Sequence, residues 1–282
     1  MCGTSTGGGE GRPAEEIHTA AKDNLRLRAN TKPVARHGRI RAVTFDLWNT
    51  IYSADDGSLD PVRPRRREAM RSLLVLHGVT PSEDELRQAY GASFDAYLAA
   101  WQAGRHYGAR EQVLFFLQWF GIDQSTADEK AILQTAREIE DAGLAAQLKP
   151  LPGVRETVEK LASTGYKLGV ISDTSLTPGR VLRIFLENDG LLPCFSALSF
   201  SDEIGYPKPD PRIFLLTLDT LGAAPHEALH IGDTPRTDIA GAKALGMVAV
   251  RCAAVMDQCE PPEADFVIRD HRELMALLDR LD

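Results

Sequence analysis

Short apolar runs rich in β-branched residues alternate with amphipathic stretches from Ile40 to the end of the chain. The runs predict strands over residues 40–45, 167–171, 197–200, 228–231, 247–251 and 265–268. Apolar residues at three-and-four spacing predict helices over residues 153–163, 178–187, 211–221, 237–245 and 271–281. Gly165, Gly222 and Gly246 fall where three of these helices should end. Strands and helices in alternation are typical of a parallel sheet covered on both faces, so we predict an α/β fold with a doubly wound parallel sheet.

Residues 61–148 interrupt this alternation, because they are helical in pattern throughout and contain no strand-like run. The apolar rows expected to pack these helices together are Leu73, Leu74, Leu76, Val113, Phe116, Leu117 and Phe120. Pro150 and Pro152 mark the return to the alternating pattern. We therefore expect an α-helical domain over residues 61–149, inserted into a core domain made of residues 38–60 and 150–282.

The first 37 residues have a different composition, rich in Gly, Ser, Thr and charged side chains. Such a segment buries too little apolar surface to offset the entropy of ordering it. We predict a disordered N-terminal tail over residues 1–37.

Composition narrows the classes of function. A net charge of −8 argues against a nucleic-acid partner, because nucleic-acid phosphates would be repelled. One basic run, Arg63, Arg65, Arg66 and Arg67, is interpreted as a solvated helix start, since no aromatic residues interleave with it. We expect a small-molecule substrate, and the sequence leaves the oligomeric state open.

The cysteines and the apolar stretches bear on location. Cys2, Cys194, Cys252 and Cys259 form no CxxC pair and have no His at zinc-ligand spacing, so they are interpreted as reduced structural thiols. No stretch reaches the roughly 18 apolar residues of a membrane span, and the N-terminus lacks the apolar core of a secretory signal. These observations predict a cytoplasmic protein without a membrane partner.

Reactive side chains follow the predicted strands. Asp46 follows the first strand, Ser172 and Asp173 follow the second, and Asp233 follows the fourth. Lys208 lies in a Pro-Lys-Pro turn after the third strand. A single Asp after a strand is usually a helix cap, but several such positions meet at the carboxyl edge of a parallel sheet, where open α/β sheets bind ligands.

Together these residues supply what phosphoryl transfer requires, which is a carboxylate nucleophile, a cation site, a lysine and a hydroxyl donor. Asp46 and Asp233 offer hard oxygen ligands that suit Mg²⁺. Asp238, five residues after Asp233, either reaches the metal through water or orients Lys208; its simplest interpretation is a helix N-terminal charge.

Four motifs in this order resemble the haloacid dehalogenase-like superfamily, a Rossmann-like α/β fold. They are Phe45-Asp46-Leu47-Trp48-Asn49-Thr50, Val170-Ile171-Ser172-Asp173, Gly205-Tyr206-Pro207-Lys208-Pro209-Asp210-Pro211, and Ile231-Gly232-Asp233 with Asp238. The resemblance covers about residues 40 to 270.

The resemblance implies that Asp46 attacks phosphorus and that Mg²⁺ binds Asp46, the main-chain carbonyl of Trp48 and Asp233, with Asp238 counted among the candidate metal residues. It implies that Ser172 and Lys208 hold the phosphoryl group. It further implies that the helical insert is a cap that closes over the site and selects the substrate. The expected activity is that of a magnesium-dependent phosphatase on a small phosphorylated metabolite, through an aspartyl-phosphate intermediate.

The sequence departs from the family at three positions. Phosphatases of the family usually place a second Asp, the general acid and base, two residues after the nucleophile, and here that position is Trp48. Loss of such a group costs about 10²- to 10⁴-fold in rate, and less with a good leaving group. Asn49 replaces a usual Gly and tolerates unusual backbone angles, and Asp173 stands where Asn is commoner.

Three interpretations therefore stay open. The first is a phosphatase that acts on activated phosphates or uses a substitute acid, for which Asp173, Asp55 and Asp56 are candidates. The second is a 2-haloacid dehalogenase, since these relatives also lack the second Asp; the acidic pair Asp233 and Asp238 argues against it, because it would repel a carboxylate substrate unless a cation is present. The third is a binding or regulatory module that keeps the fold without efficient chemistry.

Candidate substrate-binding residues come from the motifs and from one loop of the insert. Trp48, Asn49 and Asp173 are the motif positions. In the loop, Arg105 and Arg110 offer charge for an anionic group, and Tyr107 offers a ring, as does nearby Trp101. A polar turn between helices with one aromatic anchor is the favoured interpretation of this loop.

Two further groups are interpreted as structural. The aromatic residues Phe115, Phe116, Trp119 and Phe120 have the spacing of a helical core rather than of a ligand site. His226 and His230 have no carboxylate partner at a recognisable spacing, so we expect them at the surface or satisfied in the core.

Overall fold

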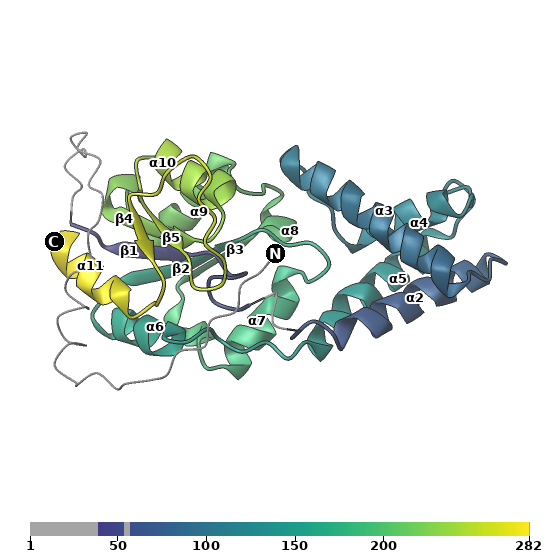
Figure 1. The fold of residues 1–282 in the computed structure, drawn as a ribbon, viewed down its shortest axis with the longest axis horizontal. Helices are drawn as coiled ribbons and strands as arrows, with labels where there is room; N and C mark the ends of the chain where they lie inside the picture. Colours follow the sequence, from purple (N-terminus) through teal and green to yellow (C-terminus); the bar gives the residue numbers. More distant parts are fainter. Residues whose placement is uncertain (1–38, 54–56, 282) are drawn as a thin grey trace, which may run out of the picture. The chain divides into compact units, whose positions relative to one another are not determined.

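A sheet of six parallel strands forms the centre of the structure, a computed structural model that describes residues 39–53 and 57–281 (Figure 1). The strands are β1 (Ala42–Phe45), β2 (Lys167–Ser172), β3 (Ala197–Phe200), β4 (Ala228–Gly232), β5 (Val248–Cys252) and β6 (Phe266–Ile268). Their order is β3-β2-β1-β4-β5-β6, so the sheet grows from β1 first to one side and then to the other. The doubly wound α/β fold and all six predicted strands are confirmed. The predicted tail over residues 1–37 lies outside the described residues.

Helices cover both faces of this sheet (Figure 1). They are α6 (Val154–Ser163), α7 (Gly179–Asn188), α8 (Ser201–Ile204), α9 (Pro211–Leu221), α10 (Ala240–Ala244) and α11 (Glu273–Leu281). Short 3-10 helices lie at Ala142–Ala145, Leu192–Cys194 and Pro225–Glu227, and a π-helix lies at Pro235–Ile239. The single helix predicted over residues 237–245 is therefore wrong in detail, because the widened π-helical turn precedes α10.

The two faces follow from the two-residue period of a strand. Val43 and Phe45 of β1 pack into one apolar cluster with side chains of α6, α7 and α11. Ala42, one position away, packs into a second cluster with side chains of α9 and α10. Both faces of β1 are thus buried, and its carboxyl end is the part left for chemistry.

Helix α9 shows how local sequence sets an element that positions the site. Asp210 caps its N-terminus, where the side chain accepts a hydrogen bond from the Arg212 amide at 2.9 Å, and Pro211 is its first residue. Gly222 ends it with φ of 65°, a left-handed conformation that glycine adopts without strain. The ends predicted at Gly222, Gly165 and Gly246 are confirmed, since all three have positive φ.

Residues 62–141 form four helices with a hydrophobic cluster of their own, apart from the two clusters of the sheet. They are α2 (Val62–Leu76), α3 (Glu83–Gln102), α4 (Ala109–Trp119) and α5 (Glu129–Asp141). Helix α3 begins with a reciprocal cap, in which the Ser82 hydroxyl accepts from the Glu85 amide and the Glu85 carboxylate accepts from the Ser82 amide. We call these four helices the helical insert.

The predicted core of the helical insert is confirmed in most positions and wrong at two. Leu73, Leu74 and Phe116 are buried. Leu76, the last residue of α2, is 76% exposed. Trp119 ends α4 in the same way and is 46% exposed, with its ring stacked on Phe115.

Two further observations concern thiols and membranes. Cys194, Cys252 and Cys259 are free, as predicted, and Cys259 is exposed, whereas Cys2 lies outside the described residues. Within residues 39–53 and 57–281, no helix has the length and apolar character that crossing a membrane requires.

Candidate active site

The sheet brings its reactive side chains together at the carboxyl ends of three adjacent strands. β1 lies between β2 and β4, and the Asp46 amide, just past β1, donates to the Ile231 carbonyl of β4 at 2.7 Å. Ser172 is the last residue of β2 and Asp233 directly follows β4. The juxtaposition predicted from the strand ends is therefore present.

Lys208 reaches this edge from the loop between α8 and α9. Its ammonium donates to Asp46 Oδ1 at 2.5 Å and to Asp238 Oδ1 at 2.6 Å, and its side chain is 3% exposed. Burial alone would lower the pKa of Lys208, but the charges of Asp238, Asp46 and Asp173 outweigh burial and raise it. Lys208 is therefore a permanent buried cation bridging two carboxylates.

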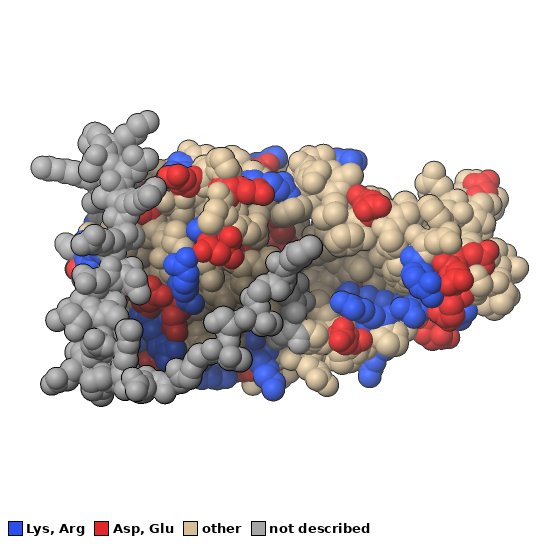
Figure 2. Space-filling view, viewed as in Figure 1, with Lys and Arg blue, Asp and Glu red and all other residues tan. Residues whose placement is uncertain are grey.

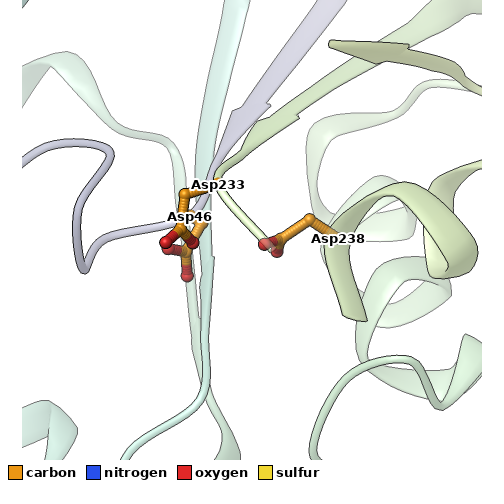
Figure 3. A group of neighbouring side chains, drawn as sticks. All are labelled: Asp46, Asp233 and Asp238. Carbon is orange, nitrogen blue, oxygen red and sulfur yellow. The ribbon is translucent and has the colours of Figure 1, made fainter. Parts of the chain in front are cut away.

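Three buried aspartates form a group next to that cation. The carboxylates of Asp46, Asp233 and Asp238 lie within 4.8 Å of one another. Figure 3 shows Asp46 and Asp233 close together at the strand ends, with Asp238 pointing toward them from the helical side. Burial raises the pKa of Asp46 well above its ordinary value, with Lys208 opposing and the other two aspartates adding to the rise. Burial and the charge of Asp238 raise the pKa of Asp233 to about 6.

The donor set fits a small divalent cation. Asp233 forms no ion pair with a described Lys or Arg; its carboxylate accepts from the neutral groups of Thr234 at 3.0 Å and of Asn49 and Gln258 at 3.5 Å. Three carboxylates facing one lysine leave negative charge uncompensated, and a cation held by Asp46 and Asp233 would balance it. Few carboxylates and several waters are the ligands that Mg²⁺ prefers.

Asp238 is held differently from the other two. Its Oδ1 accepts from Lys208 and from His230 Nε2 at 3.2 Å, and its Oδ2 accepts from the Thr234 amide at 3.0 Å. Burial would raise the pKa of Asp238, but Lys208 and His230 lower it to about 2. Both oxygens already have protein partners, which favours the role of orienting Lys208 over direct metal ligation.

Gly232 makes this position of Asp238 possible. A Cβ atom on Gly232 would lie 2.2 Å from Cγ of Asp238, far closer than non-bonded carbon atoms approach each other. The glycine in the fourth motif therefore leaves room for the carboxylate to approach the end of β4.

His230 is a residue that the sequence interpretation missed. The prediction that it lacks a carboxylate partner is wrong, because it contacts Asp238 and its Nδ1 lies 2.9 Å from the Thr44 hydroxyl. A carboxylate only accepts, so a neutral imidazole donates from Nε2 and accepts from Thr44 at Nδ1. The available signal was a histidine in an otherwise apolar strand, directly opposite Thr44 in β1. His226 is exposed, as expected.

Asp173 links this edge to the helical insert. Its Oδ1 accepts from the Lys208 amide at 2.8 Å, and its Oδ2 accepts from Nε1 of Trp101 in α3 at 3.1 Å. The guanidinium of Arg236 stacks on the Trp101 ring, 3.5 Å from its centroid. Burial raises the pKa of Asp173. Ser172, fully buried, donates its hydroxyl to the Asp173 carbonyl at 3.2 Å.

Asn49 sits in the turn after β1. It has φ of 56°, the positive value for which Asn was expected to be suited, and it is the one non-glycine residue with positive φ in the described part of the chain. Its amide donates to the Tyr52 carbonyl at 2.6 Å, which closes the turn that carries Trp48.

The loop residues proposed for substrate contact divide into two groups. Tyr107 is half-buried, with its hydroxyl 3.0 Å from that of Ser93. Arg105 is exposed, and Arg110 is exposed and paired with Glu129 at 3.1 Å. Among the described residues, the structure brings Tyr107 and Trp101 toward the site but not the two arginines. The other candidate acids, Asp55 and Asp56, lie outside the described residues.

A cavity of about 620 Å³ adjoins the site. It is lined by residues of the turn after β1, of the helical insert and of the segment that follows Asp173, namely Trp48, Leu59, Arg63, Arg66, Arg67, Arg87, Tyr90, Ser93, Phe94, Tyr97, Tyr107, Gln112, Ser175, Leu176 and Thr177. Trp48 lies two residues from Asp46 and Ser175 two residues from Asp173, so part of the lining comes from the two segments that carry these aspartates.

Known proteins are similar to this chain in sequence and in fold. A family described as "Hydrolase: haloacid dehalogenase-like hydrolase" matches residues 40–246. "Glyceraldehyde 3-phosphate phosphatase" of Methanopyrus kandleri is 31% identical over 252 residues, which cover 86% of this chain and 98% of that protein. "Haloacid dehalogenase-like hydrolase domain-containing protein 3" of Bos taurus is 30% identical over 258 residues, which cover 88% and 96%.

A solved structure agrees with both. The crystal structure of a HAD phosphatase from Thermococcus onnurineus is 29% identical, with a TM-score of 0.58, and the match covers 85% of this chain and 98% of that chain. Sequence motifs, sheet topology and relatives of nearly full length thus lead to one conclusion. The chain belongs to the haloacid dehalogenase-like hydrolases.

Proposed function

We propose that the protein is a phosphoric monoester hydrolase with Asp46 as its covalent nucleophile. The observation that carries the proposal is the buried group at the strand ends, where Lys208 bridges Asp46 and Asp238 with Asp233 beside them. A nucleophilic carboxylate next to a fixed cation and a possible metal site is what displacement at a phosphoryl group requires. The phosphatase names of similar proteins support the same reaction class.

The proposed reaction has two steps. An Asp46 carboxylate oxygen attacks phosphorus, the ester P–O bond breaks, and the leaving oxygen takes up a proton, which gives an aspartyl-phosphate. Water then attacks phosphorus, the acyl phosphate bond breaks, and inorganic phosphate and free Asp46 result. Lys208 neutralises the charge that develops on the phosphoryl oxygens, and the Ser172 hydroxyl turns from the Asp173 carbonyl to donate to one of them.

The cofactor in this proposal is Mg²⁺, held by Asp46, Asp233 and the main-chain carbonyl of Trp48. The ion, when bound, supplies Lewis-acid stabilisation of the phosphoryl oxygens. Asp238 acts by holding Lys208, because both of its carboxylate oxygens are bonded within the protein.

The leaving group needs a proton donor, because Trp48 occupies the usual position of the general acid. Of the aspartates at this edge, Asp46, Asp233 and Asp238 have other roles in the proposal, which leaves Asp173, whose pKa burial raises toward the range useful for proton transfer. Its two N–H donors favour the ionised form and oppose this role. We therefore propose substrates with good leaving groups, with Asp173 as the substitute acid for others.

The substrate we propose is a small phosphorylated metabolite. Relatives of nearly full length carry the name glyceraldehyde 3-phosphate phosphatase, which supports this size class. The helical insert, proposed as a cap domain over residues 61–149, selects the substrate through the cavity beside the site, while residues 38–60 and 150–282 form the catalytic core. Trp48, Asn49 and Tyr107 remain proposed substrate contacts. We also propose a cytoplasmic location, with no nucleic-acid partner.

The test is an assay of the full chain on p-nitrophenyl phosphate and acetyl phosphate, with Mg²⁺ and with a chelator. We expect magnesium-dependent turnover that Asp46→Asn abolishes. Asp279→Asn, which removes an exposed carboxylate from α11, serves as the matched control and should retain activity. Turnover that survives Asp46→Asn would overturn the covalent role.

Two alternative outcomes have distinct signatures. Chloride release from 2-chloropropionate in the presence of chelator would identify a dehalogenase. Absence of turnover of every substrate, with a folded protein, would identify a binding module that keeps the fold.

A further inference from the structure

Arg66 is a part-buried cation that has no carboxylate partner among the described residues. Its Nε donates to the Ile139 carbonyl at 3.1 Å, and its Nη2 donates to the Leu176 carbonyl at 2.7 Å and to the Thr177 hydroxyl at 2.8 Å. No described Asp or Glu forms an ion pair with it, and burial lowers its pKa to about 10. The prediction that this arginine run is a solvated helix start is therefore wrong for Arg66.

The other arginines of the cavity differ from Arg66 in this respect. Arg63 pairs with Asp60 at 3.2 Å, and Arg87 pairs with Asp84 at 2.8 Å. Figure 2 shows basic and acidic side chains next to one another on the surface of the helical insert. These charges are compensated at the surface, whereas Nη1 of Arg66, which remains accessible to solvent, donates to no described residue. An uncompensated guanidinium on the wall of a cavity offers a charge-assisted hydrogen bond to an anionic group of a ligand.

Gln112 supplies an independent observation on the same cavity. Its side chain is 6% exposed, and its Oε1 has no hydrogen-bond partner among the described residues. Its Nε2 donates to the Ser93 hydroxyl at 3.3 Å. A buried amide oxygen left unpaired costs stability unless a ligand or water donates to it.

The rest of the lining indicates the body of that ligand. Tyr90, Phe94 and Tyr97 of α3 and Leu176 present apolar and aromatic surface to the cavity. A cavity of about 620 Å³ is within the size range of small-molecule sites. It exceeds what a phosphorylated three-carbon compound would fill.

We infer that this cavity binds the leaving-group part of the substrate, which carries an apolar or planar body and a second anionic oxygen group that Arg66 pairs with. Gln112 accepts a hydrogen bond from a hydroxyl or amino group of the same body. This inference rests on the proposed phosphatase function, because Asp46 must hold the phosphoryl group at the other end. Arg66 and Gln112 are thus specificity residues for a doubly anionic phosphate ester.

The experiment measures binding, so that it does not depend on turnover. Full-length Asp46→Asn protein is titrated calorimetrically with phenyl phosphate and with its 2-, 3- and 4-carboxylated forms. At least one carboxylated ester should bind about tenfold or more tightly than phenyl phosphate, as expected for one charge-assisted hydrogen-bonded pair. Phenylene bisphosphates, titrated in parallel, show whether a carboxylate or a phosphate is preferred.

Variants locate the effect. Adding Arg66→Gln should remove the preference for the carboxylated ester, whereas Arg65→Gln, which removes an exposed charge from the same helix outside the cavity, should keep it. Arg66→Lys retains the charge and serves as a second variant in case Arg66→Gln fails to fold. It should keep part of the preference for the carboxylated ester. Gln112→Met should leave the preference for the carboxylated ester intact. It should weaken the binding of esters that carry a ring hydroxyl.

Two results would overturn the inference. One is equal binding of phenyl phosphate and all its charged derivatives. The other is a preference that survives Arg66→Gln. Failure of the proposed function is a separate result, namely no turnover of p-nitrophenyl phosphate by the wild-type protein.

Discussion

Replacement of His230 by Phe tests whether the buried histidine holds Asp238. The substitution keeps a ring of similar shape, which preserves the edge contact with Phe214 at 5.1 Å between ring centroids. It removes the donor to Asp238 Oδ1. Thr44 loses one acceptor but can still donate to the Leu229 carbonyl at 3.3 Å. The cost should therefore come mainly from one hydrogen bond to a charged group.

The expected magnitude follows from that count. A hydrogen bond to a charged group contributes about 1.5 to 3 kcal/mol. We expect His230→Phe to lower the free energy of unfolding by about 2 kcal/mol, roughly a 30-fold change in the folding equilibrium constant. The same replacement at His226, which is exposed, should change it by less than about 0.5 kcal/mol.

The assay is urea denaturation at pH 7 with chelator, because a bound metal would stabilise the native state and mask the difference. A double-mutant cycle with Asp238→Ala, which removes the acceptor, separates the lost hydrogen bond from misfit of the new ring. If the bond is the cause, the two changes should couple by an amount close to the single cost. Additive costs would refute the reasoning, as would a His230→Phe protein as stable as the His226 control.

Three further predictions concern the site and its surroundings. Gly232→Ala places a methyl group 2.2 Å from Asp238 Cγ and should cost about 1 to 3 kcal/mol of stability with loss of turnover, while Gly91→Ala in α3, where a Cβ meets nothing within 4 Å, should be neutral or stabilising; equal stabilities in denaturation would contradict this. Trp48→Asp should raise kcat on alkyl phosphates by about 10²-fold or more relative to acetyl phosphate, and an unchanged ratio of the two rates would show that Trp48 does not mark a missing acid. Burial lowers the pKa of His271 from 6.5 to about 4, so between these pH values the unfolded chain binds a proton that the folded protein does not. The free energy of unfolding therefore decreases as the pH is lowered from 6.5 to 4. His271→Asn should remove up to about 3 kcal/mol of the stability lost between pH 7 and 4, measured by denaturation at both pH values, and an unaltered loss would refute it.

Much of this molecule is determined by local sequence. Apolar runs placed every strand, because a strand buried on both faces is mostly apolar, as β1 is apart from Thr44. Asp46, Ser172 and Asp233 were found from their positions after strands, because parallel strands bring their carboxyl ends to one edge. The motifs also indicated the family, and Asn49 carries the backbone angle expected of it.

Other features depend on contacts between segments far apart in the chain. His230 acquires its role because β4 pairs with β1 in the register that places Thr44 opposite it, and because Gly232 lets Asp238 approach. Trp101 meets Asp173 across 72 residues of sequence. No periodicity within one segment carries this information.

The run Arg63, Arg65, Arg66 and Arg67 shows how local sequence and tertiary structure divide these roles. Composition and helical spacing do not distinguish Arg65 from Arg66, since both lie in the first turns of α2. Tertiary structure exposes Arg65 and places Arg66 against the carbonyls of Ile139 and Leu176, which come from segments 73 and 110 residues away. The sequence by itself determined the sheet, its reactive edge and the types of side chain found there. Only the packing of the helical insert against that edge decided which charges are desolvated, because burial is a property of the assembled surfaces.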